Sequence, residues 1–218
     1  MAALAMGGLL VTSLIAGCAS EVRKLPITYA PQQNVQAIKG ADAVPVEVRV
    51  EDLQPAPSAA PWSPRYLFTP PNKYFRVKDA ADTIKGAAET ELRARGFKIA
   101  DGGALVTIQL DRFAAMCETN NFTKSSSHGY ISLRIHVQAQ TGKVLYSREV
   151  KGEANPFYFW GTWKCATPEL QGSLADGFRR LFADPAFTAA ILATRQPPPA
   201  KPVSPGRIAG AFATMSRR

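Results

Sequence analysis

Metal-binding residues are scarce in this sequence. Its 218 residues include two histidines and three cysteines, so a single chain cannot assemble a conventional His₃ or Cys₄ metal centre. The apolar run at residues 9–15 is too short to cross a bilayer as a helix, which needs about 20 residues. With 46% hydrophobic and 20% charged residues, the chain is neither wholly disordered nor a multi-span membrane protein. We therefore expect one domain with a real core and no metal or other bound cofactor.

The excess of positive charge is unevenly distributed. The formal net charge is +9, a value typical of nucleic-acid binders. Five of those charges lie in the acid-free segment after Thr194, which leaves only +4 for the body. We therefore predict no nucleic-acid partner. Residues 195–218 are predicted to form a disordered, basic, proline-rich tail that is either simply solvated or reaches anionic headgroups or glycans.

The N-terminus resembles a bacterial lipoprotein signal. The first 16 residues carry no charge, and the segment Leu-Ile-Ala-Gly-Cys at 14–18 is similar to a lipobox. This resemblance implies a signal peptide over 1–17, a diacylglycerol on the Cys18 thiol and, after cleavage, an acyl chain such as palmitate on its freed amine. Because Ala19 and Ser20 follow the cysteine, the likeness to sorted lipoproteins implies an outer-membrane anchor facing the periplasm. The alternative is an ordinary apolar helix with a chance cysteine.

Cys117 and Cys165 remain as a pair once Cys18 is lipidated. The periplasm is oxidising, so we predict a disulfide between them. That bridge would close a loop of about 48 residues and stabilise the fold by about 4 kcal/mol in the chain-entropy model. The alternative is two separate free thiols.

The chain is predicted to contain one folded domain over 45–194, preceded by the lipidated cysteine and a tether over 18–44. A proline-rich irregular loop is expected at 54–72 and a polar loop between 111 and 130. The expected elements are a strand at 45–51, a helix at 79–95, strands at 106–111, 130–140 and 143–150, and a helix from 167 that restarts at 185.

These elements indicate an α+β fold with a small mixed or antiparallel sheet. Their order is strand, helix, three strands, helix. Each strand has one apolar and one polar face, so we expect helices on one face of the sheet only, with the polar face open.

Several short segments together are similar to the YajG family of uncharacterised bacterial lipoproteins. They are the lipobox, LPITYAP at 25–31, GAD at 40–42 before a Val-x-Val-x-Val strand, ELRARGF at 91–97 and GALV at 103–106. The resemblance covers most of residues 14–192. It implies no catalytic residues, because the family has no established enzymatic activity. The sequence departs from the family pattern at Gln54, in an apparent insertion at 154–166 and in its basic tail.

The main candidate interaction surface is an aromatic segment before Cys165. Five of its seven residues are aromatic, so alternation along the segment cannot direct all of these side chains into one core. Some are expected to be exposed, and exposed aromatic residues mark binding surfaces. The alternative is a loop that plugs the end of the sheet. The aromatic residues are Phe157, Tyr158, Phe159, Trp160 and Trp163.

Polar candidates are weaker. Arg134 and His136 share the polar face of one strand and are kept as part of the candidate surface. Ser127 and His128 are adjacent in an expected loop, and adjacent residues rarely achieve nucleophile–base geometry, so we predict no catalytic site.

The sequence therefore predicts a non-enzymatic interaction or assembly module of the cell envelope, with an envelope protein as partner and the membrane bound through the lipid. The alternative is an accessory lipoprotein that binds a lipid or sugar for a transport system. An apolar groove under residues 156–163 would favour the alternative, whereas a flat polar sheet face would favour the interaction module.

Overall fold

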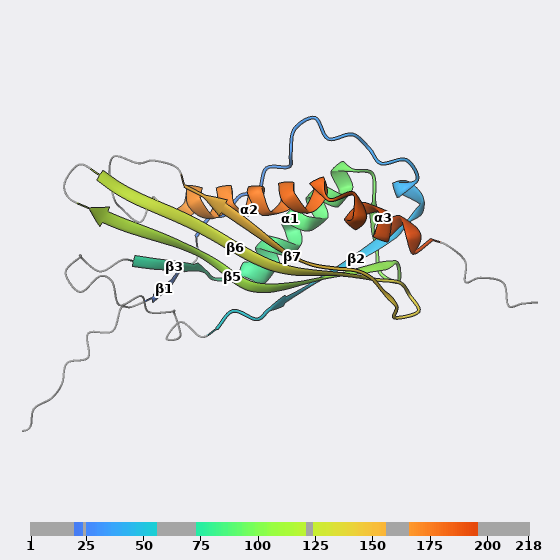
Figure 1. Ribbon diagram of the computed structural model, residues 1–218, viewed down its shortest axis with the longest axis horizontal. Coiled ribbons are helices and arrows are strands. Elements are labelled where there is room, and N and C mark those ends of the chain that lie inside the picture. Colours follow the sequence, from blue (N-terminus) through green and yellow to red (C-terminus); the bar gives the residue numbers. More distant parts are fainter. Residues whose placement is uncertain (1–19, 24, 56–72, 121–123, 156–165, 196–218) are drawn as a thin grey trace, which may run out of the picture.

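The computed structural model describes residues 20–23, 25–55, 73–120, 124–155 and 166–195. A long twisted sheet forms one layer, and the helices lie together on one of its faces (Figure 1). The strands are β1 (Ser20–Arg23), β2 (Pro45–Asp52), β3 (Lys73–Val77), β4 (Lys98–Ile99), β5 (Ala104–Asn120), β6 (Lys124–Gln138) and β7 (Val144–Ala154). The helices are α1 (Ala80–Ala94), α2 (Ala166–Ala183) and α3 (Pro185–Ala193), and a 3₁₀ turn η1 covers Ala41–Ala43.

Strand β5 organises the sheet. One of its edges pairs antiparallel with β6, which pairs with β7. Its other edge pairs parallel with β2 along the first half and antiparallel with β3 along the second half. The short strands β4 and β1 extend β2 and β3, both in parallel. The predicted α+β class, mixed sheet and single helical face are confirmed.

Strand alternation separates the two faces of the sheet as predicted. Side chains that face the helices are almost completely buried, while those between them stay partly exposed. The helices present matching apolar stripes at helical spacing. The central buried residues are Val106, Ile108 and Leu110 of β5, Ile131, Leu133, Ile135 and Val137 of β6, Ile84, Ala88 and Leu92 of α1, and Leu170, Leu174 and Phe178 of α2.

A glycine in the left-handed conformation ends α1. Gly96 has φ +90°, its N–H donates to the Arg93 carbonyl, and the Phe97 N–H donates to the Leu92 carbonyl at 3.1 Å. This is a Schellman motif, with Phe97 buried against the last turn. At the other end, Asp79 has the N-cap position but a left-handed backbone, and its side chain makes no capping hydrogen bond.

The prediction of a polar loop between residues 111 and 130 is wrong. Strand β5 continues to Asn120 and β6 begins at Lys124, so most of that segment is a long β-ladder. The extension is held by tertiary contacts: β3 pairs with residues 114–117, and α2 approaches the backbone at Gly129. Serines and threonines can occupy strands when such partners are present. The short strands β1, β3 and β4 had no recognisable pattern of their own.

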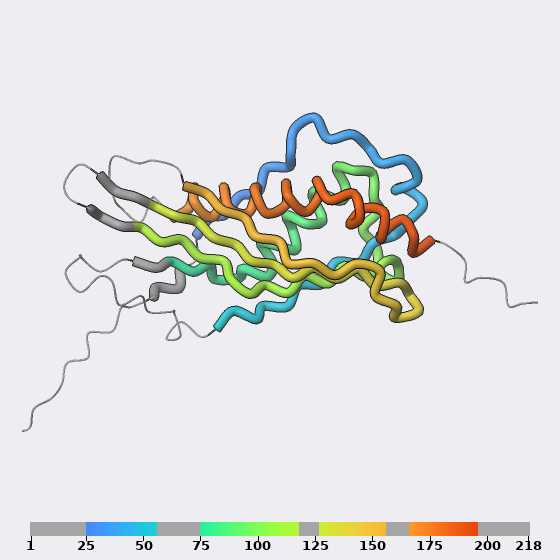
Figure 2. Tube along the Cα trace, in the orientation of Figure 1, coloured from blue at the N-terminus to red at the C-terminus, as the bar shows by residue number. Residues whose placement is uncertain are grey.

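The described residues of the expected tether are part of the fold. Leu25 is buried, and Ile27, Tyr29 and Ile38 pack against the core. We call residues 25–44 the strap; it runs along the helical side of the molecule (Figure 2). The Tyr29 ring meets the ring of Phe178 edge-on at 5.6 Å. The prolines and glutamines suggested a free linker, but the apolar residues between them provide enough contacts to dock the segment.

Several predicted features lie outside the described residues: the signal peptide, Cys18, the aromatic segment 157–163, Cys165 and the tail from 196. Cys117 is disulfide-bonded, and its partner is not among the described residues. None of the helices in the described ranges is long and apolar enough to span a membrane.

Candidate functional site

Arg134 lies in the middle of the open sheet face. Alternation along β6 directs it away from the helices, and β5 and β7 place Gln109 and Glu149 beside it. Its guanidinium donates two hydrogen bonds to Asp111, from Nε to Oδ2 at 2.8 Å and from Nη2 to Oδ1 at 2.6 Å. A bulge after Leu110 brings Asp111 into reach. Arg134 is therefore held in a fixed orientation by a bidentate pair.

The pKa values on this face record the same pairing. The hydrogen bonds from Arg134 hold the pKa of the Asp111 carboxyl below its usual value, and those bonds raise the pKa of Arg134 in turn. Hydrogen bonds from Lys151 and Ser132 lower the pKa of Glu149. These charged groups are stabilised as ions, which suits a polar contact surface better than proton transfer at neutral pH.

His136 shares this face with Arg134 but not its charge network. Its cross-strand neighbours are Thr107 and Ser147, and the side chain is half-buried. A shallow hollow of about 360 Å³ lies on the same side of the sheet, around Ser132. Its lining is Asp111, Arg112, Tyr130, Ile131, Ser132, Glu149, Lys151, Gly152 and Glu153.

Ser127 and His128 point to opposite faces of β6. The Ser127 hydroxyl donates to the buried carboxylate of Glu169, while the His128 ring stacks on Tyr130 and its Nδ1 lies 2.7 Å from Asn155 Oδ1. Strand alternation thus separates the serine from the histidine. In the described part of the chain, no three His, Cys, Asp or Glu side chains are grouped closely enough to hold a metal ion.

Glu169, in the first turn of α2, is fully buried. One carboxylate oxygen accepts from Ser127, and the other has no hydrogen-bond partner. Burial raises the pKa of Glu169, and the hydrogen bond from Ser127 opposes that shift only in part. No local sequence pattern predicts this contact, because it joins Ser127 of β6 to a helix residue 42 positions away.

Glu91 is a second buried carboxylate, and it fastens the strap to α1. It accepts hydrogen bonds from the Tyr29 hydroxyl at 2.6 Å and from the Gln32 N–H at 2.8 Å, and it pairs with Arg95. The Arg95 guanidinium also lies 3.8 Å above the Phe182 ring. Burial and the bond to Glu91 raise the pKa of Tyr29. This cluster has a structural role, joining the strap and both long helices.

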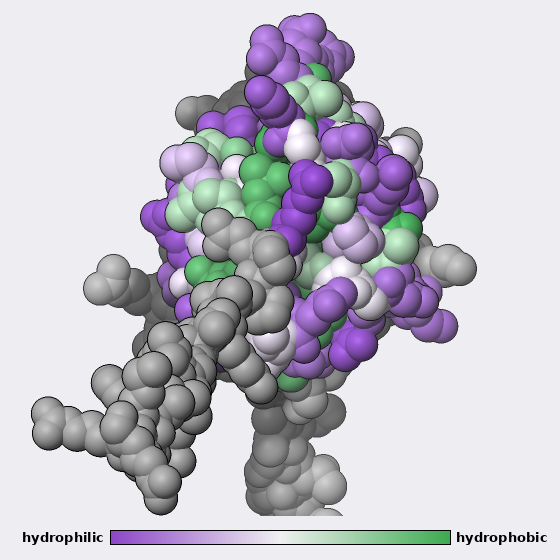
Figure 3. Space-filling view, turned by 90° about the vertical axis from the view of Figure 1, so that its right-hand side faces the viewer, coloured by the Kyte–Doolittle hydropathy of each residue, from purple (hydrophilic) through white to green (hydrophobic). Residues whose placement is uncertain are grey.

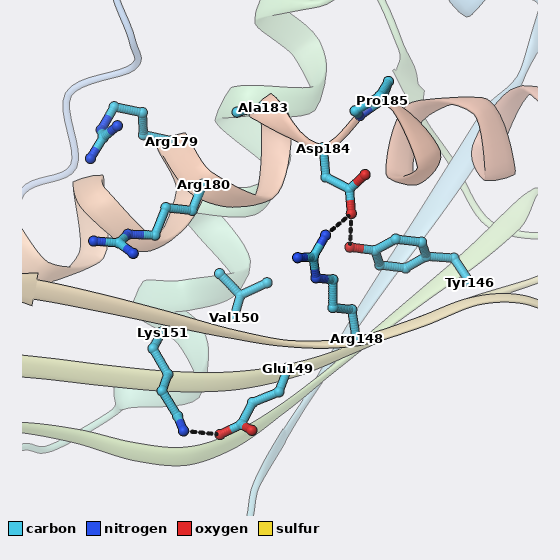
Figure 4. A pocket seen from close by; sticks show the side chains of 10 residues that line it. All are labelled: Tyr146, Arg148, Glu149, Val150, Lys151, Arg179, Arg180, Ala183, Asp184 and Pro185. Atoms are coloured by element: carbon cyan, nitrogen blue, oxygen red, sulfur yellow. Dashed lines mark hydrogen bonds and ion pairs between the residues drawn. The ribbon is translucent and has the colours of Figure 1, made fainter.

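A larger hollow, of about 610 Å³, lies between β7 and the C-terminal part of α2. In Figure 4, Arg148 rises from β7 toward Asp184, while Glu149 and Lys151 lie on the other side of the strand. Asp184 accepts from Arg148 at 2.6 Å and from the Tyr146 hydroxyl at 3.0 Å, and it caps α3 through the Ala186 N–H. We call this hollow the β7 groove; its lining is Tyr146, Arg148, Glu149, Val150, Lys151, Arg179, Arg180, Ala183, Asp184 and Pro185.

Hydrogen bonds set the ionisation of the β7 groove. The bonds from Arg148 and the Ala186 N–H hold the pKa of Asp184 below its usual value. Burial and the bond to Asp184 raise the pKa of Tyr146 to about 12. Asp184 is therefore a carboxylate, and Tyr146 a neutral hydrogen-bond donor, across the physiological pH range.

Large apolar side chains are rarely exposed. Among the described residues, the large hydrophobic side chains that are exposed are Leu53 and Val144, at 48% each. At the end of the molecule that carries α3, hydrophilic residues surround a small hydrophobic area (Figure 3). The described surface therefore favours polar contacts over an apolar docking site.

The fold and these surfaces define an α+β domain with an open, charge-paired sheet face and a basic groove at its edge. The family described as uncharacterized lipoprotein, Lipoprotein_16, matches residues 73–191, which is more than half of the chain. The chain belongs to this family, and the match confirms the predicted likeness to YajG-type lipoproteins. The family indicates association with the cell envelope, and its description names no enzymatic activity.

Other comparisons add little. A search of the curated proteins found no match. The crystal structure of protein XCC0632 from Xanthomonas campestris, of the DUF330 family, is similar with 11% identity and a TM-score of 0.44, covering 80% of this chain and 96% of that one.

Sequence reasoning placed Arg134 and His136 together on the polar face of one strand, where the structure has them, but gave no sign of the β7 groove. Its basic residues come from two segments, β7 and α2, and each segment alone resembles an ordinary charged surface. The aromatic segment lies outside the described residues, so its role stays a prediction.

Proposed function

We propose that this protein is a lipid-anchored module of the outer membrane that faces the periplasm and binds another envelope component without catalysing a reaction. The observation that carries the proposal is the open sheet face. It extends across β5, β6 and β7, and its charged side chains are paired with one another around Arg134. Such a surface is suited to a polar protein contact.

The position of Cys18 in the chain supports a close membrane anchor. Ser20, the first residue of β1, pairs with Tyr74 of β3, and β3 in turn pairs with β5 near Cys117. Two peptide units span at most about 7.6 Å, so acyl chains on Cys18 would hold this end of the sheet at the bilayer. The docked strap leaves no long linker within the described residues 25–44.

The alternative is an accessory protein that binds a lipid or sugar, and its lipid-binding form needs an apolar groove. Both hollows described above are lined largely by charged side chains, including Arg148, Glu149 and Lys151. Acyl chains bind in mainly apolar cavities. The described surface therefore favours the interaction module over a lipid-binding role.

Mass spectrometry and fractionation test the anchor. We expect the mature protein to begin at an acylated Cys18 and to sediment with outer membranes. Cys18→Ala should abolish acylation and leave the protein out of the outer-membrane fraction. Lys85→Ala serves as the control, because it changes an exposed side chain of the folded domain without touching the lipobox or the cysteines. A wild-type protein without acyl chains would contradict the anchor.

Photo-crosslinking tests the interaction. A photoreactive amino acid at Arg112, which is exposed in the hollow on the open face, should give a discrete protein adduct in living cells. The same probe at Lys85, exposed on α1, is the control and should give none. Equal adducts from both positions, or adducts with lipid alone, would contradict a specific protein contact on this face.

A further inference from the structure

We infer that the β7 groove binds an extended acidic segment of a partner protein, which adds to the sheet as a strand beside β7. The inference rests on the proposed function and specifies the chemistry of the partner. In the described structure β7 pairs with β6 alone, so its other edge is the edge of the sheet. Sheet edges bind extended peptides through main-chain hydrogen bonds.

The orientation of one amide defines which backbone groups are free. The Glu153 N–H points away from β6 and donates to Asp176 of α2 at 3.1 Å. In an antiparallel pair the outward positions recur at every second residue. The N–H and C=O groups of Ser147, Glu149 and Lys151 therefore also point outward, toward the space where an added strand would lie.

Helix α2 determines where that edge is accessible. At Gly152 the helix backbone sits directly on the strand, and at Glu153 the Asp176 carboxylate caps the edge. Farther along, the β7 groove opens between α2 and β7. The accessible stretch 147–151 spans about 17 Å at 3.4 Å per residue, enough for a strand of about five residues.

The charges of the β7 groove select an acidic partner. Arg179 and Arg180 both pair with the one carboxylate of Asp176, so two guanidinium groups share one negative charge. Arg148 is bound to Asp184. The Asp184 carboxylate also accepts hydrogen bonds from the Tyr146 hydroxyl and the Ala186 N–H. Lys151 is paired with Glu149 at 3.1 Å and lies toward the open face. The three arginine side chains are 57–65% exposed and can each add a contact to a further anion.

Two other occupants fit poorly. A second copy pairing through its own β7 would bring like charges together, because Arg148, Arg179 and Arg180 flank both edges. The chain's own tail after Arg195 is basic and contains Pro197, Pro198 and Pro199 in succession, which lack the N–H groups a strand must donate. An acidic segment of another protein satisfies both the charges and the backbone.

Strand pairing also predicts a sequence pattern in the partner. Side chains of the added strand that point toward the helical side would meet Arg148, Arg179 and Arg180, so these alternate positions should be Asp or Glu. The side chains between them would lie beside Glu149 and Lys151 on the open face. Ala183 and Pro185, both exposed at one end of the groove, can contact an apolar residue there.

The test uses the full-length acylated protein in detergent and a fluorescent peptide of about ten residues that alternates Glu and Val. We expect saturable binding by fluorescence anisotropy and slowed amide hydrogen exchange confined to β7. Ser147→Pro removes one outward N–H from the strand edge, where proline is tolerated, and should weaken binding by about tenfold or more. Ser147→Ala keeps that N–H and should bind like wild type.

Further controls separate strand addition from simple charge attraction. Combined Arg179→Glu and Arg180→Glu should also weaken binding by about tenfold or more, and a Lys-Val peptide should not bind. The inference is overturned if Ser147→Pro and Ser147→Ala bind equally, if a peptide with N-methylated backbone amides binds as well as the parent, or if a sulfated polysaccharide protects β7 equally. These outcomes leave the anchor and the Arg112 adduct untouched, so a failure here is distinguishable from a failure of the proposed function.

Discussion

Two buried glutamates differ in how completely their neighbours satisfy them. The Glu91 carboxylate is bound by a hydroxyl, a backbone amide and a guanidinium. Glu169 has a single hydroxyl donor and one oxygen without a partner. Burying an ion is tolerated only when its hydrogen bonds are supplied, so the partly satisfied Glu169 suits a neutral state.

Glu169→Gln should change how stability depends on pH. Because burial raises the folded-state pKa above the ordinary value of 4.5, the folded protein binds this proton more tightly than the unfolded chain. The free energy of unfolding therefore falls as pH rises from about 4.5 through the folded-state pKa, and levels off above it. Glutamine does not titrate, so it removes that loss. The free energy of unfolding of the variant, measured with urea, should therefore rise relative to that of wild type as pH rises.

The other carboxylates do not alter this difference in stability between the variant and wild type. Asp111 and Asp184 have lowered pKa values, so their contributions are lost only as pH falls below the ordinary aspartate range, and equally in both proteins. Glu153→Gln is the matched control, because it makes the same substitution at an exposed side chain. A constant difference for Glu169→Gln would contradict the assigned environment.

Removing Glu91 should release the strap. Glu91→Ala leaves the Arg95 guanidinium buried without its carboxylate and should lower the free energy of unfolding by about 3–5 kcal/mol. Tyr29→Phe removes one hydrogen bond to the same carboxylate and should cost about 1 kcal/mol. Because both act on one cluster, the double variant should cost less than the two losses added together, as measured by urea unfolding. Additive losses would show that Tyr29 and Glu91 do not cooperate.

At the scale of elements, glycine sets how closely α2 approaches β7. A Cβ at Gly152 would lie 2.1 Å from the Ser173 carbonyl oxygen and 2.5 Å from the Gly177 nitrogen. Neither of these is a flexible side-chain atom, so the helix itself would have to move. The close approach also brings Asp176 to the edge of β7 and forms one boundary of the β7 groove.

Gly152→Ala should therefore destabilise the fold by about 1–3 kcal/mol or more, as overpacked sites do. Gly86→Ala is the control: it lies in α1 with open space around the added Cβ, and should stabilise the protein by about 0.5–1 kcal/mol. Thermal and urea unfolding measure both. Comparable stabilities for the two variants would contradict the close packing of α2 on β7.

Periodicity predicted the elements that carry their own pattern. The alternation in β2 and β6 and the apolar stripe of α1 identified strands, helix and covered face correctly, because burial on one side leaves a period in the sequence. The Ser-rich start of β6 carries no such period, so its pattern predicts a loop. The docking of the strap and the β7 groove also depend on contacts between distant segments, which no local pattern records.

At the scale of the molecule, the two ends of the sheet differ. One end holds β1, the C-terminal end of β5, the N-terminal end of β6 and the start of α2 (Figure 1). The other end holds the β6–β7 turn and α3. Cys117 belongs to the first end, opposite Ser127, whose hydroxyl reaches Glu169 in the first turn of α2. Cys165 immediately precedes α2, which favours the predicted bridge to Cys117.

Breaking that bridge should weaken the whole domain. Cys165→Ser and Cys117→Ser should each lower the free energy of unfolding by about 4 kcal/mol, because each opens the same loop of about 48 residues. The double variant should lose no more than either single one. Peptide mapping without reductant should recover Cys117 linked to Cys165. A Cys117–Cys18 peptide would contradict both the pairing and the lipid anchor.

The central claim is that this lipoprotein acts by binding another envelope protein. The most direct measurement is photo-crosslinking in living cells from Lys151, because that residue lines both the open-face hollow and the β7 groove. We predict one discrete adduct, identified by mass spectrometry as a protein with an exposed acidic segment. Adducts with lipid or glycan alone, or no adduct at all from this exposed position, would contradict the account.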